Sequence, residues 1–103
     1  MRAEAIAVLY GEAMEELSGA ITYARCAAKW KTDSAENHKN FIAMANDELR
    51  HAVMLRDMSC KEVERARAAH PDNAYICAYH DSFMEHFADE YGHVKQMLAG
   101  FAG

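Results

Sequence analysis

The chain has 103 residues, which fits one small domain spanning residues 1–103. About half of its residues (51%) are hydrophobic, and its single proline and few glycines favour an all-α fold. Its formal charge of −5 at pH 7 argues against a protein that binds nucleic acid through the phosphate backbone.

Two short breaks divide the sequence into three predicted helices, near residues 3–30, 34–69 and 73–99. The second break contains Pro71, which cannot lie inside a helix. Because short turns make consecutive helices antiparallel neighbours, the sequence predicts a three-helix antiparallel bundle.

Residues that can cap the helices stand at both breaks. Asp33 can cap the second helix, with Glu36 three residues later completing a capping box. Asp72 or Asn73 can cap the third helix.

The first helix has an apolar stripe at helical spacing, consisting of Ile6, Leu9, Ala13, Leu17, Ala20 and Ala24. Glu16 and Tyr23 flank this stripe and lie ~10 Å apart along the helix axis. The phenol of Tyr23 can donate an electron or bond a ligand carboxylate, or the ring can pack with its hydroxyl at the edge. The pattern leaves both roles open.

The second and third helices each contain the spacing Glu-x-x-His, as Glu48 with His51 and Glu90 with His93. Residues three apart share a helix face, so each copy directs a carboxylate and an imidazole to one point. Both copies interrupt a predicted apolar face. On the second helix that face contains Phe41, Met44, Leu55 and Met58; on the third it contains Ile76, Phe83, Phe87, Val94, Met97 and Phe101. A carboxylate on such a face is costly unless it is paired or bound to metal.

Distances along the helices place these residues in one layer. Glu16 and Glu48 each lie ~24 Å from the first turn. The two Glu-x-x-His pairs lie ~28–34 Å from the second turn. The layer therefore predicts a metal site, with a buried, hydrogen-bonded cluster of Glu and His without metal as the alternative. Carboxylate and imidazole suit iron, manganese and zinc alike.

Three segments resemble motifs of the ferritin-like superfamily, in particular bacterioferritin and rubrerythrin. Residues 16–23 resemble the first-helix motif, in which a tyrosine follows a glutamate ligand by seven residues. Residues 47–52 resemble the second-helix motif, and residues 89–94 resemble the fourth.

The resemblance implies a two-iron carboxylate centre that reacts with dioxygen or peroxide, and many such centres are ferroxidases. By this analogy Glu16 is a terminal ligand of one metal, and Glu48 and Glu90 bridge the two. His51 completes the first metal site and His93 the second.

The chain departs from the family pattern because the third of the four helices, with its glutamate, is missing. One face of the bundle would then expose apolar side chains, which predicts a homo-oligomer, most simply a dimer. The missing ligand can come from the partner, from water, or from Glu12, Glu15 or His86. A single-metal site is a further alternative.

The remaining signals are weaker. Three widely spaced cysteines, Cys26, Cys60 and Cys77, indicate free thiols in a reducing compartment. With no leader or membrane span expected, the sequence predicts a cytoplasmic protein, with residence inside a protein shell as a variant. The methionines are expected to fill the core, and His38, His70 and His80 to lie at the surface or at helix caps. The rival function is a non-catalytic Zn or Mn site, or a metal-free helical interaction module.

Overall fold

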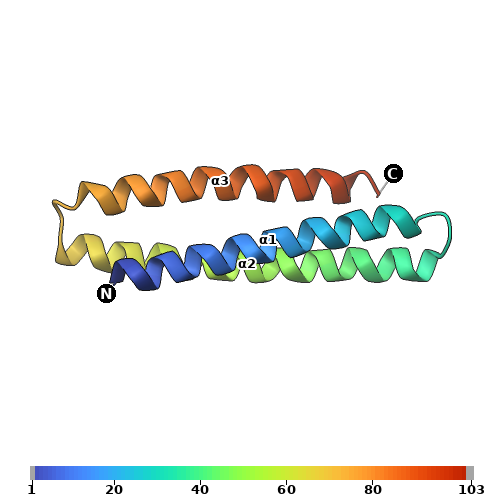
Figure 1. The fold of residues 1–103 in the computed structure, drawn as a ribbon, viewed down its shortest axis with the longest axis horizontal. Coiled ribbons are helices and arrows are strands. Elements are labelled where there is room, and N and C mark those ends of the chain that lie inside the picture. The colour runs from blue at the N-terminus through green and yellow to red at the C-terminus, as the bar shows by residue number, and fades with distance from the viewer. Residues whose placement is uncertain (1, 102–103) are drawn as a thin grey trace.

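A computed structural model describes residues 2–101 of the chain. It contains three α-helices: α1 (Arg2–Trp30), α2 (Ala35–Ala69) and α3 (Ala74–Ala99), and residues 2–101 contain no strand. The helices run alternately in opposite directions along a rod of 55 × 19 × 14 Å (Figure 1). The all-α fold is confirmed, and the predicted helix bounds agree with the structure to within one residue.

The cap of α2 differs from the predicted one by one residue. Ser34, not Asp33, is the N-cap: its backbone is extended (φ −157°, ψ 109°) and its hydroxyl accepts a hydrogen bond from the Asn37 amide at 3.1 Å. Asp33 is still in the turn, where its amide donates to the Trp30 carbonyl. The predicted cap of α3 is confirmed, since the side chain of Asn73 accepts from the Ile76 amide at 3.2 Å.

Small residues bring α1 and α2 close together. The most deeply buried positions of the two helices are largely alanines, and such side chains let two backbones approach closely: Ala13, Ala20, Ala24, Ala27, Ala45 and Ala52. Helix α3 lies farther from this pair (Figure 1) and makes fewer close backbone approaches to it. The closest helix–helix contact in the described structure is therefore the one between α1 and α2.

The apolar face predicted for α2 is partly wrong. Met44 and Met58 are 40% and 50% exposed. The residues that α2 buries are instead Ala45, Leu49, Ala52, Ser59, Val63 and Ala66. Helix α1 packs against the face of α2 that carries small alanine side chains, because only these allow a close approach. The larger methionines therefore lie outside the helix contact. Glu48 and His51 consequently lie at the border of the helix contact, partly accessible to solvent.

Aromatic rings attach α3 to the other two helices. Phe83 and Phe87 are buried, as predicted, and the Tyr10 ring of α1 stacks on Phe83 with centroids 4.0 Å apart. The Arg56 guanidinium of α2 lies over the Phe87 ring at 5.2 Å. His80 is also buried, so its predicted surface or capping role is wrong. Within residues 2–101, no helix combines the length and hydropathy needed to span a membrane.

Candidate metal site

Glu16 of α1 meets Glu48 and His51 of α2 near the middle of the bundle. Each of the three contributes one potential ligand atom, and these atoms all lie within 4.8 Å of one another. The His51 Nδ1 lies 3.7 Å from Glu16 Oε2 and 4.0 Å from Glu48 Oε1. Glu48 and His51 are three residues apart and share a face of α2, and Glu16 and Glu48 lie at equal distances from the first turn. These two relations explain why the three side chains meet.

One oxygen of Glu16 has no hydrogen-bond partner although it is buried. Among the described residues, Glu16 Oε2 is the only buried side-chain nitrogen or oxygen in that state. An unsatisfied buried acceptor costs free energy comparable to a lost hydrogen bond, and more when it is charged. Its position beside Glu48 and His51 is the arrangement expected where a cation completes the group.

The two carboxyl groups perturb each other. The pKa of Glu48 is raised from its ordinary value of 4.5. The main cause is a hydrogen bond that its protonated form can make to Glu16; burial and the charge of Glu16 add to it, and His51 opposes it. A divalent cation would remove this mutual repulsion, because it provides opposite charge to both groups.

Gly19 makes room for the Glu48 carboxylate. A Cβ atom added at Gly19 would lie 2.8 Å from Glu48 Oε2, closer than real side chains approach. Gly19 follows Glu16 by three residues, so both line the same face of α1. A role for Gly19 was not predicted from the sequence, although its spacing of three residues from Glu16 could have indicated one.

The site is open on one side. The His51 side chain is 43% exposed, whereas those of Glu16 and Glu48 are 26% and 27% exposed. Small molecules such as water or dioxygen can therefore reach the imidazole side while the carboxylates remain partly shielded.

The other Glu-x-x-His pair lies outside this group. Glu90 of α3 is half-buried and His93 is exposed, and neither joins the three clustered ligand atoms. The structure thus brings together three of the five predicted ligands. The assignment of Glu90 and His93 to a second metal stays a prediction.

Tyr23 is half-buried and its ring stacks against Phe41, with centroids 6.2 Å apart. This contact corresponds to the packed-ring role that the sequence left open. The alternative role in electron transfer stays a prediction.

Comparison of the chain with known protein families, curated proteins and solved structures gave no match. The likeness to the ferritin-like superfamily therefore depends on the three helix motifs alone, and the geometry of the site has to support any function.

Proposed function

We propose that this chain binds ferrous iron between α1 and α2 and promotes its oxidation by dioxygen. The observation that supports this most directly is the buried Oε2 of Glu16, which accepts no hydrogen bond in the structure and lies 3.7 Å from the Nδ1 of His51. The donor set is two carboxylates and one imidazole, which suits ferrous iron.

The charges of the site favour the oxidised product. Two carboxylates attract a trivalent ion more strongly than a divalent one, because the Coulomb energy scales with the charge of the ion. Binding by Glu16 and Glu48 therefore makes loss of an electron from iron easier. Two ferrous ions give one electron each to dioxygen, which takes up two protons from water and leaves as hydrogen peroxide.

A variant of the imidazole ligand tests the proposal. His51→Ala is expected to lower iron-dependent oxygen uptake by about tenfold or more, since loss of even a ligand's supporting partner commonly costs 10–100-fold in affinity or activity. Oxygen consumption after addition of ferrous salt to metal-free protein measures the effect, and circular dichroism checks the fold.

His70→Ala is the matched control, because His70 is exposed at the end of α2 and lies outside the site. It is expected to consume oxygen like the wild type. Wild-type uptake no faster than that of free iron would refute the oxidase and leave the non-catalytic Zn or Mn site as the better account.

We also propose that the chain functions as a homodimer. Large apolar side chains are exposed on all three helices, including Val8, Met54 and Tyr75. Contact between two copies would cover such residues and supply the carboxylate that a second ion at Glu90 and His93 needs.

The mass of the protein in solution tests the dimer. Light scattering at micromolar concentration is expected to give twice the chain mass of 11.6 kDa. Tyr75→Ser should shift the population toward monomer, whereas a wild-type protein that stays monomeric with and without iron would contradict the proposal.

A further inference from the structure

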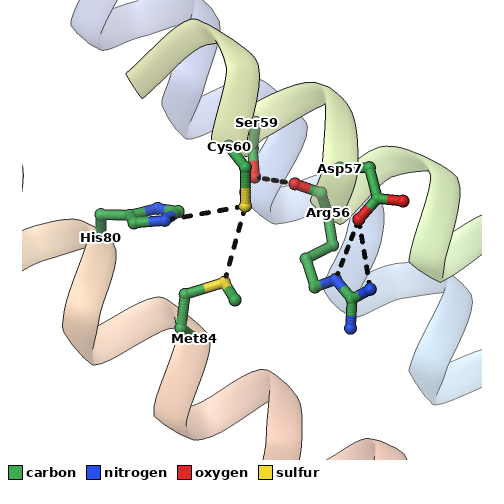
Figure 2. A network of polar contacts seen from close by, with 6 residues as sticks. All are labelled: Arg56, Asp57, Ser59, Cys60, His80 and Met84. Atoms are coloured by element: carbon green, nitrogen blue, oxygen red, sulfur yellow. Dashed lines mark hydrogen bonds and ion pairs between the residues drawn. The ribbon is translucent and has the colours of Figure 1, made fainter. Parts of the chain in front are cut away.

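A second group of potential metal ligands lies between α2 and α3. The Cys60 Sγ of α2 lies 3.8 Å from the Nε2 of His80 and 4.0 Å from the Sδ of Met84. Figure 2 shows the cysteine sulfur pointing between the imidazole and the thioether. His80 and Met84 are four residues apart on α3, so they present their side chains on one face.

The two separations from the Cys60 sulfur are those of ligands around a three-coordinate metal. Metal bonds of about 2.3 Å to sulfur and about 2.0–2.1 Å to imidazole nitrogen, at 120° to one another, place sulfur and nitrogen ~3.8 Å apart and two sulfurs ~4.0 Å apart. A tetrahedral arrangement would bring both pairs closer.

Tyr10 of α1 holds the imidazole from its other side. The Tyr10 hydroxyl oxygen lies 2.7 Å from the Nδ1 of His80. When Nδ1–H donates to this oxygen, the lone pair of Nε2 faces Cys60. A hydrogen bond of this kind fixes the ring orientation and tautomer of metal-binding histidines in general. His80 is only 8% exposed, so this orientation is also fixed by packing.

The ionisation states argue against a nucleophilic Cys–His pair. Burial raises the pKa of the Cys60 thiol, and burial lowers the pKa of His80, assisted by the charge of Arg67. The pair is therefore a neutral thiol beside a neutral imidazole, not the thiolate–imidazolium pair that activates a nucleophile.

We infer that Cys60, His80 and Met84 form a binding site for a soft monovalent cation, Cu(I). Thiolate and thioether sulfur select Cu(I), and the thioether distinguishes this site from a zinc site. The thiol of Cys60 gives up its proton to solvent as the Cu(I)–sulfur bond forms, with no change in oxidation state. The site is separate from the iron site, since Cys60 lies ~13 Å along α2 from His51.

Anaerobic titration of the metal-free full-length chain with Cu(I), in competition with a chromogenic Cu(I) chelator, tests the inference. One tightly bound Cu(I) per chain is expected, and X-ray absorption should show two sulfur atoms and one nitrogen. Met84→Leu conserves volume and so should preserve the fold, but it is expected to weaken Cu(I) binding at least tenfold. Cys60→Ser is expected to abolish it.

Two matched controls separate this site from general binding by sulfur. Cys26→Ser replaces another half-buried thiol, and Met54→Leu replaces an exposed methionine of α2. Both are expected to bind Cu(I) like the wild type. Unchanged affinity in Met84→Leu, or equal losses in Cys26→Ser and Cys60→Ser, would overturn the three-ligand site.

Discussion

Replacement of Glu48 by glutamine is expected to stabilise the metal-free protein and to remove its stabilisation by iron. In the metal-free protein the carboxyl groups of Glu16 and Glu48 share one partly buried site, and the pKa of Glu48 is raised mainly by its contact with Glu16. Glutamine cannot carry the charge that Glu16 opposes, and a single stabilising substitution commonly gains about 0.5–2 kcal/mol. The same change removes a ligand, so iron binding should fail.

The pH dependence of this gain has a definite sign. The folded state raises the pKa of Glu48, so the folded state holds its proton more tightly than the unfolded chain does. Below the ordinary pKa of 4.5 both states are protonated and the wild type keeps the full benefit of this group. As the pH rises through the raised pKa the benefit is lost. The advantage of Glu48→Gln over the wild type should therefore be small near pH 4 and largest at neutral pH.

Urea unfolding of both proteins between pH 4 and pH 7.5, with and without ferrous iron under nitrogen, measures the two effects. Wild-type protein should gain about 2.7 kcal/mol when free iron exceeds the dissociation constant 100-fold, and Glu48→Gln should gain almost nothing. Asp47→Asn is the control for iron binding, because it removes the neighbouring exposed carboxylate and keeps all three ligands. An iron-dependent gain in Glu48→Gln equal to that of the wild type would contradict the assignment of Glu48 as a ligand.

The fold was predictable from the sequence because its signals are local. Pro71 and the capping residues of both turns fix where helices begin and end, and these effects act within one helical turn. The N-cap of α2 was predicted one residue too early, at Asp33 instead of Ser34. Aspartate and serine are both good N-caps, so local capping chemistry does not distinguish the two positions.

The packing was less predictable because it depends on the partner helix. The stripe with Met44 and Met58 and the stripe with Ala45 and Ala52 are both apolar and lie side by side on α2. Hydrophobic spacing cannot choose between them, but close approach to the alanines of α1 does. His80 shows the same limit, since its burial depends on Tyr10 of α1, 70 residues away in the sequence.

The candidate site was also predictable only in part. Glu16, Glu48 and His51 were predicted together because helical spacing and distance from one turn determine their meeting. Glu90 and His93 have the same spacing, but α3 lies farther from the other two helices (Figure 1). Distance along the helix axis alone therefore does not determine which side chains meet, and neither residue joins the group.

Replacement of Gly19 by alanine is expected to strengthen the fold and weaken the metal site. Alanine in a helix interior is more favourable than glycine by up to about 1 kcal/mol. The added methyl would collide with Glu48 Oε2, the end of a flexible side chain, so the carboxylate can turn away at little cost to the fold. Once displaced from Glu16 and His51, it no longer completes the ligand group. A loss of tenfold or more in affinity for ferrous iron is expected, measured by anaerobic titration.

Gly11→Ala separates the two effects on the same helix. A Cβ at Gly11 would have no atom within 4 Å, so this variant should gain helix stability and keep the wild-type affinity for iron. If both variants raise the melting temperature and only Gly19→Ala loses affinity, the loss arises from the position of one carboxylate and not from a change in overall stability. Equal affinity in the two variants would mean that Glu48 binds iron from a position away from Gly19. The glycine beside Glu48 would then be incidental to the site.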